Sequence, residues 1–170
     1  MNEAMPPLTA DGRASQAITD GVTEHPDVVL DGLRDDDLPA LCAWFNNIDE
    51  LHFWTTRRLP RPYADLEADI RDRCRVGLFT VIRSLATGEP CGFLDGKVRE
   101  LHGVAEFEVY LPAGSRLRSG LVAIYRFVSH LFASYPLRKV YCQTYAYNSR
   151  VVHLLEASGF VKEGCFKEFT

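Results

Sequence analysis

The segment LRKVYCQTYAYNSRVVHLLEASGFVKEG, residues 137–164, decides which fold this chain adopts. Over residues 140–145, Val, Cys and Thr alternate with Tyr, Gln and Tyr, and this β-branched and aromatic run has the two-residue period of a strand. Ser149 can cap a following helix, which has apolar residues along one face over residues 151–155. Gly159 can end that helix, because a left-handed terminus favours a residue without Cβ. The segment predicts a strand, a turn, a helix and the start of another strand.

The same two periodicities predict the remaining elements of a mixed α/β (α+β) domain. In chain order we expect a strand at 27–34, helices at about 35–45 and 64–75, strands at 78–83, 91–99 and 105–111, and a long amphipathic helix after residue 118. The strand at 140–146 and the helix after it complete the order. No internal repeat interrupts it.

Composition limits the class of protein. The chain has 170 residues, 46% of them hydrophobic, which suits one domain with a real core over 25–170. Residues 1–24 are polar and small, so we expect a disordered leader there. No apolar run reaches 18 residues, and a net charge of −4 disfavours general nucleic-acid binding. The five cysteines share no metal-binding spacing, which favours a reducing cytoplasm without disulfides, zinc or another metal.

The C-terminal segment also carries a family resemblance. Its order of strand, Asn, short helix, Leu-Leu-Glu, small residue, Gly-Phe, basic residue and Glu-Gly resembles the GCN5-related N-acetyltransferases (GNAT), closest to their ribosomal-protein (RimJ/RimL-like) branch. The resemblance covers about residues 27–170. It implies the GNAT fold, whose mixed central sheet is splayed between its fourth and fifth strands and flanked by helices.

One departure from the family concerns the end of the sheet. The family closes with a β-hairpin, and this chain ends at Thr170 after only the first of its two strands, so we expect the final strand to be missing. An unpaired edge of this kind favours pairing with another chain, which predicts a possible homodimer.

The resemblance implies an acyl-CoA-dependent N-acetyltransferase without a metal, in which an amine attacks the thioester of acetyl-CoA or another acyl-CoA directly. The acceptor would be a small-molecule amine or a protein N-terminus. Two alternatives stay open. One is a GNAT-like binding or scaffold domain without catalysis. The other is a biosynthetic acyltransferase that takes its acyl group from an acyl carrier protein, for which a basic patch is available in Arg116, Arg118, Arg138 and Lys139.

The donor's pyrophosphate is held in the family by a Gln/Arg-x-x-Gly-x-Gly/Ala loop at a helix N-terminus. Gly120 falls on the first glycine, while Leu117 and Val122 depart from the pattern. The implied cofactor-binding residues of this loop are Arg116, Arg118, Ser119, Gly120, Leu121 and Val122. The alternative is two surface arginines beside an N-cap glycine.

The pantetheine arm is expected between the strands 105–111 and 140–146. A bulge near Val109, Tyr110 and Leu111 would expose backbone N–H groups to it. Asn148 matches the family's Asn after the fifth strand and would bond the pantetheine amide. The alternative is an ordinary turn asparagine before a helix.

Glu106 and Glu108 share one face of their strand, since side chains alternate along it. The family often uses an acid on this strand to deprotonate the amine, so both are candidate catalytic residues and Glu108 is favoured. The alternative is that both only solvate an open face. The family's tyrosine general acid is absent, because Leu155 stands at its position. Cys142 is a remote candidate for covalent chemistry and more plausibly structural.

The acceptor site is expected in the loop between the first two helices. The segment from Trp44 to Glu50 resembles the branch's Trp-x-Asn-(Asn/Asp)-x-Glu pattern. The implied substrate-binding residues are Asn46, Asn47, Glu50 and Trp54. The alternative is a helix terminus with packed aromatic rings, and the sequence does not choose between the two.

Overall fold

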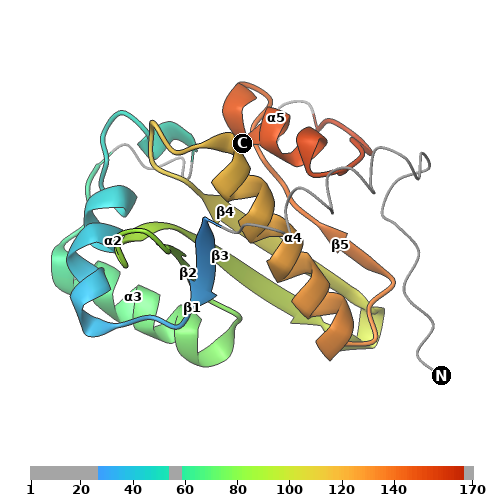
Figure 1. Cartoon of the computed structure of the whole chain (residues 1–170), viewed down its shortest axis with the longest axis horizontal. Helices are drawn as coiled ribbons and strands as arrows, with labels where there is room; N and C mark the ends of the chain where they lie inside the picture. Colours follow the sequence, from blue (N-terminus) through green and yellow to red (C-terminus); the bar gives the residue numbers. More distant parts are fainter. Residues whose placement is uncertain (1–26, 54–58, 167–170) are drawn as a thin grey trace.

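The computed structural model describes residues 27–53 and 59–166, so the expected leader and Trp54 lie outside the described residues (Figure 1). The first half contains β1 (Val28–Asp31), η1 (Asp35–Asp37), α2 (Leu38–Phe45), η2 (Leu51–Phe53), α3 (Tyr63–Val76) and β2 (Thr80–Ser84). The second half contains β3 (Pro90–Arg99), η3 (Glu100–His102), β4 (Val104–Tyr110), α4 (Leu117–Ser134), β5 (Lys139–Tyr141) and α5 (Ser149–Ala157).

The strands form one mixed sheet in the order β1-β2-β3-β4-β5. The first three pairings are antiparallel, and β4 pairs with β5 in parallel. That last pairing is short, because only Val104 to Glu106 of β4 face Lys139 to Tyr141 of β5. The chain then leaves the sheet while β4 continues, so the expected splay between the fourth and fifth strands is confirmed.

Helices cover both faces of the sheet (Figure 1). On one face α4 and α5 pack on a core that includes Ala105, Phe107 and Val109 of β4. On the other face α2 and α3 pack on a second core that includes Phe93 and Tyr110. The alternation along β4 therefore sends Ala105, Phe107 and Val109 towards α4, and its two glutamates, with Tyr110, towards the α3 side.

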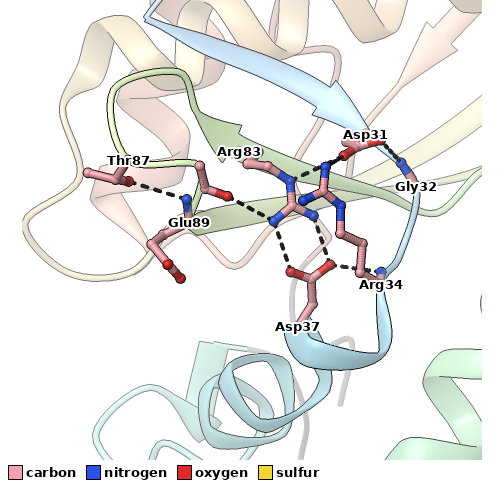
Figure 2. A network of polar contacts seen from close by, with 8 residues as sticks. Asp31, Gly32, Arg34, Asp37, Arg83, Thr87 and Glu89 are labelled. Atoms are coloured by element: carbon pink, nitrogen blue, oxygen red, sulfur yellow. Dashed lines mark hydrogen bonds and ion pairs between the residues drawn. The ribbon is translucent and has the colours of Figure 1, made fainter.

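A network of charges, drawn in Figure 2, ties β1 and β2 to the start of α2. Arg83 of β2 donates to both carboxylate oxygens of Asp37, at 3.0 Å and 2.9 Å, and its Nε donates to Asp31 at 3.2 Å. Arg83 is 5% exposed and Asp37 only 1%. A guanidinium buried this deeply needs such bidentate partners, because an unpaired buried charge is costly.

Two expected strands differ from the structure. The fifth strand, expected at 140–146, ends at Tyr141. The strand expected after Gly159 is not formed within the described residues, which have no regular structure from Phe160 to Phe166. Gly159 lies at a φ of 86°, and the Phe160 ring then contacts Phe107 at 5.5 Å between centroids. The pairing of this sheet edge with a second copy stays a prediction.

None of the helices in the described part of the chain combines the length and apolar character that crossing a membrane requires.

A candidate active-site groove

A groove of about 1940 Å³ opens where β4 and the chain after β5 diverge. Its walls include the end of β4, residues 141–148, the start of α5 and part of α3. Ligand sites in α/β proteins commonly lie where neighbouring strands separate, because backbone groups there have no strand partner. This groove is the candidate site.

The backbone of β4 enters the groove without the expected bulge. Its register with β3 is regular from the pair Arg99 and Val104 up to the pair Phe93 and Tyr110. The expectation of a bulge near Val109, Tyr110 and Leu111 is therefore wrong. Backbone groups are freed on the other side of β4 instead, because β5 ends after three residues.

Asn148 lies at the groove end of α5 and is 9% exposed. Its Oδ1 accepts a hydrogen bond from the backbone N–H of Val151 at 3.3 Å, so the side chain caps the helix. Its side-chain nitrogen makes no hydrogen bond within the described residues and lines the groove. The capping role and a ligand-binding role therefore use different atoms of one side chain.

The N-terminus of α4 lies at the end of the loop after β4. Arg116 is its N-cap residue, so Gly120 is the fourth residue of the helix and not an N-cap glycine. A Cβ on Gly120 would lie 2.6 Å from Cδ1 of Leu111 and 2.9 Å from Cδ1 of Leu154. Glycine therefore lets α4 approach β4 and α5 closely, which explains its presence without reference to a ligand.

The two departures from the phosphate-loop pattern have different surroundings. The side chain of Val122 is fully buried in the core beneath α4, so at this position only the backbone is available to a ligand. Leu117 is exposed at the first turn of the helix. Arg116 and Arg118 are also exposed there, beside backbone N–H groups that a helix N-terminus leaves without intrahelical partners.

Glu106 and Glu108 lie on the α3 side of β4 and both line the groove. Glu108 is paired with Arg73 of α3, with 3.1 Å between Oε2 and Nη1, and its side chain remains 45% exposed. Glu106 accepts a longer hydrogen bond of 3.4 Å from the hydroxyl of Tyr141. The two carboxylates therefore differ in how firmly their positions are fixed.

Sequence reasoning missed the residues that support Glu108. Nη1 of Arg73 also contacts Asp95 Oδ2 at 2.7 Å, and the Asp95 side chain is 2% exposed. Burial raises the pKa of Asp95 even though Arg73 acts in the opposite direction. Burial acts to lower the pKa of Arg73, but Glu108 and Asp95 outweigh it and the net change is upward. A signal existed, since Arg73 follows Leu66 and Ile70 at helical spacing on the buried face of α3.

The acceptor loop uses its asparagines for its own structure. The Asn46 side chain accepts from the backbone N–H of Arg61 and donates to its carbonyl, both at 2.8 Å. Asn47 accepts from the N–H of Asp49 at 3.2 Å, an Asx turn. Of the predicted substrate-binding residues that are described, Glu50 alone lines the groove.

Glu50 is tied to the end of β4. It accepts a hydrogen bond of 2.6 Å from the hydroxyl of Tyr110. Burial and this bond to the carboxylate both raise the pKa of Tyr110, so the phenol stays protonated and continues to donate. The contact fixes the position of the Glu50 carboxylate at the wall of the groove.

A second unpredicted contact joins the two walls. The hydroxyl of Tyr147, from the segment before α5, donates to the carbonyl of His52 in η2 at 2.7 Å. The Tyr147 ring stacks on Tyr145, with 5.0 Å between centroids. The contact joins residues 95 positions apart in sequence, which is why local patterns did not reveal it.

The structure also shows what surrounds Cys142 and the residues of the suggested basic patch. Burial, together with Glu108 and Glu106, raises the pKa of the Cys142 thiol to about 12, so this cysteine is a poor nucleophile. In the suggested basic patch, Arg138 donates to the carbonyl of His102 and Lys139 pairs with Glu163. Arg138 and Lys139 of the patch are therefore engaged within the chain.

Comparison with known proteins gives a consistent fold. The sequence matches no protein-family model, and no curated protein is similar to it in a sequence search. Among solved structures, it is similar to spermidine N-acetyltransferase from Vibrio cholerae in complex with CoA and spermine. That match has a TM-score of 0.70 and 22% identity and covers 81% of this chain and 83% of the other.

Two other solved structures are similar. Aminoglycoside acetyltransferase AAC(6')-Ib in complex with coenzyme A aligns at a TM-score of 0.64 and 19% identity, over 81% of this chain and 86% of that chain. A domain from Methanocaldococcus jannaschii aligns at a TM-score of 0.69 and 17% identity, over 85% of this chain and 94% of that chain. At these identities the likeness establishes the fold, and the chain has the GNAT fold.

Proposed function

We propose that this protein is an N-acetyltransferase that transfers an acetyl group from acetyl-CoA to the primary amine of a small cationic molecule. The observation that supports this most is the groove between β4 and residues 141–148, with the capping asparagine at one end and carboxylates on one wall. Similar solved structures contain CoA together with spermine or an aminoglycoside, which agrees with both substrates.

The donor would lie along the splay. When bound, acetyl-CoA supplies an activated acyl carbon. The backbone N–H groups at the start of α4, with Arg116 and Arg118, are suited to hold its phosphates. The side-chain nitrogen of Asn148 is suited to hold the pantetheine arm. Val109 and Tyr110 would offer backbone groups only, since their side chains are buried, whereas Leu111 is half-buried and lines the groove.

The acceptor would enter from the α3 side. Glu108 and Glu106 are suited to attract an ammonium group and to take up its proton, directly or through water, so that a neutral amine forms the new C–N bond. The C–S bond breaks as the amide forms, and the leaving thiolate takes a proton from water. Leu155 stands where the family has a tyrosine, so no side chain at that position donates this proton.

Among the described residues, the groove as a whole is lined by equal numbers of acidic and basic residues, and only the charges on its α3 side favour a cationic acceptor. Its α3 side is lined by the carboxylates of Glu50, Asp69, Glu106 and Glu108 and by two arginines, Arg61 and Arg73. The excess of negative charge attracts amines and repels acidic substrates. Membership of the ribosomal-protein branch is a further part of this proposal, and the panel of acceptors below tests it.

The first test is calorimetric titration with acetyl-CoA. We expect a Kd near 1 μM, equivalent to about −8 kcal/mol. The matched variant is Asn148→Ser, because serine also caps helices but removes the side-chain amide. It should weaken binding by about tenfold, the cost of one good hydrogen bond. An unchanged thermal transition would show that the cap is intact.

The second test is turnover with a panel of amines: spermidine, kanamycin and a peptide with a ribosomal-protein N-terminus. Release of free CoA with spermidine or kanamycin supports the proposal, and turnover of the peptide alone would favour the ribosomal-protein branch. No heat and no thermal shift with millimolar acetyl-CoA would overturn the proposal and favour a GNAT-like binding domain.

A further inference from the structure

We propose that Arg73 is a positioning residue, which holds the carboxylate of Glu108 at the wall of the groove by bridging it to the buried Asp95. The inference rests on the proposed function, because it assigns the support on which the candidate base depends. Nη1 of Arg73 makes both contacts, at 2.7 Å to Asp95 and at 3.1 Å to Glu108. Asp95 and Glu108 are paired across β3 and β4.

The surroundings of Arg73 restrict its side chain from several directions. Its guanidinium lies over the ring of Phe45, with 5.7 Å from Cζ to the ring centroid. Its Nε lies 3.6 Å from Oδ2 of Asp69 one turn earlier in α3. Asp69 in turn accepts from Arg61, which Asn46 holds through its backbone. The guanidinium is thus fixed between the core and the loop expected to bind the acceptor.

The exposure of the side chains increases along this bridge, from the core to the groove. The side chain of Asp95 is 2% exposed, that of Arg73 is 26% and that of Glu108 is 45%. A wholly structural ion pair would be satisfied by Asp95 and Arg73 alone. The second carboxylate faces the groove, so the bridge links a fixed charge in the core to a carboxylate that a ligand can reach.

Glu106 offers an internal contrast. It lies on the same face of β4, two residues earlier, and it accepts a hydrogen bond of 3.4 Å from the hydroxyl of Tyr141. Glu108 has an arginine partner with two further anchors, whereas Glu106 has a weak neutral one. Arg73 therefore favours Glu108 as the carboxylate with a defined position, and catalytic groups depend on such positioning.

The experiment is a double-mutant cycle measured in kcat/KM for spermidine and acetyl-CoA, with Arg73→Gln, Glu108→Gln and the double variant. If Arg73 acts through Glu108, Arg73→Gln lowers kcat/KM by about 10-fold to 100-fold, and the double variant is no worse than Glu108→Gln alone. Arg73→Lys should recover only part of the loss, because one ammonium group can take the place of Nη1 but cannot also replace the contact of Nε with Asp69. Multiplicative losses in the double variant would overturn the inference.

Controls separate folding, donor binding and the proposed function. Arg75→Gln removes an arginine from the same helix that, among the described residues, pairs only with Asp72 at the surface, and should leave kcat/KM unchanged. Arg73→Gln/Asp95→Asn removes both charges of the buried pair, so it should fold even where Arg73→Gln does not, and should still lose activity. Wild-type levels of activity in this variant would overturn the inference.

The calorimetric Kd for acetyl-CoA should be the same in every variant, since none of these residues belongs to the donor side. A wild type that does not bind acetyl-CoA, or binds it and acetylates no amine of the panel, would overturn the proposed function and this inference with it. If the wild type acetylates an amine of the panel but the losses of Arg73→Gln and Glu108→Gln multiply in the double variant, only the inference about Arg73 is overturned.

Discussion

Arg83 and Arg73 each bridge carboxylates from different elements, and only one of these two clusters opens on the groove. In the closed cluster, Arg83 holds Asp37 and Asp31 between β1, β2 and η1 (Figure 2). In the open cluster, Arg73 holds Asp95 and Glu108 between α3, β3 and β4. Both clusters pair an arginine with two carboxylates. They differ in what the more exposed carboxylate faces, because Glu108 lines the groove and Asp31 does not.

The difference separates a structural role from a functional one. The closed cluster joins the first strand to the start of α2, far along the sheet from the splay, and none of its residues lines the groove. Arg73 and Glu108 of the open cluster do line it. Variants in the closed cluster should therefore change stability without changing activity, and variants in the open cluster should change stability and the reaction with the acceptor while donor binding stays the same.

The largest expected effect comes from breaking the closed cluster. Asp37→Ala leaves Arg83 buried without its bidentate partner, and should lower the free energy of unfolding by about 3–5 kcal/mol. Urea denaturation followed by circular dichroism measures it. The control is Arg34→Ala, which removes a more exposed pair with Asp31 and should cost less than about 1 kcal/mol. Equal losses in the two variants would contradict the assignment of a closed cluster.

A smaller loss of stability is expected in the open cluster. Arg73→Met leaves Asp95 without its cation, but Arg73 is partly exposed and water can replace some of the lost contacts. We expect a loss of about 1–3 kcal/mol in the same denaturation experiment. Adding Asp95→Asn should recover much of it. A loss as large as that of Asp37→Ala would show that both clusters are primarily structural.

The pH dependence of stability should have opposite signs in the two clusters. The backbone N–H of Gly32 lowers the pKa of Asp31 below its ordinary 3.8, and Arg34 and Arg83 add to this against burial. Below pH 3.8 the unfolded chain therefore binds more protons at Asp31, and its contribution to stability is lost as the pH falls through the folded-state pKa.

Asp95 behaves in the reverse way. Its raised pKa means that the folded chain binds more protons just above 3.8, so its contribution falls as the pH rises through that window. In urea denaturation from pH 3 to pH 7, Asp31→Asn should flatten the acid limb, and Asp95→Asn should remove a decline at higher pH. The same slope in both variants would contradict the contrast.

Local patterns were enough to predict most of the fold. Short-range periodicity in the sequence predicts features that depend on neighbouring residues. Examples are the amphipathic face of α4, the alternation along β4 and the segment around Gly159. The boundaries of β5 were less predictable, because a strand ends where its partner diverges and not where its own residue types change. The bulge in β4 was inferred from the family, and the regular register with β3 contradicts it.

The candidate site was predictable only in part. Glu106, Glu108 and Asn148 stand out because of their positions on elements. Arg73 acquires its meaning from Asp95, which is 22 residues away in sequence, and from Glu108, which is 35 away. Asn46 and Asn47 show the opposite case, because residues that match a binding pattern also hold the loop itself together, and their role towards a substrate stays a prediction. Such pairings depend on tertiary packing, which no local period encodes.

The smallest expected effect concerns a thiol that reports on the open cluster. With a pKa raised to about 12 by burial and by Glu108 and Glu106, Cys142 should carry about a thousandfold less thiolate at pH 8 than an ordinary cysteine. Iodoacetamide should therefore modify the exposed Cys165 well before Cys142, as mass spectrometry of tryptic peptides can measure.

Glu108→Gln should speed the modification of Cys142, because it removes a carboxylate that disfavours the thiolate. Asp37→Asn, in the closed cluster, should leave the rate unchanged in protein that remains folded. Together these variants test whether the charge of the open cluster reaches the groove and that of the closed cluster does not. Rapid alkylation of Cys142 in the wild type would contradict a protonated thiol, and would bring back a covalent role for the cysteine in place of direct attack by the amine.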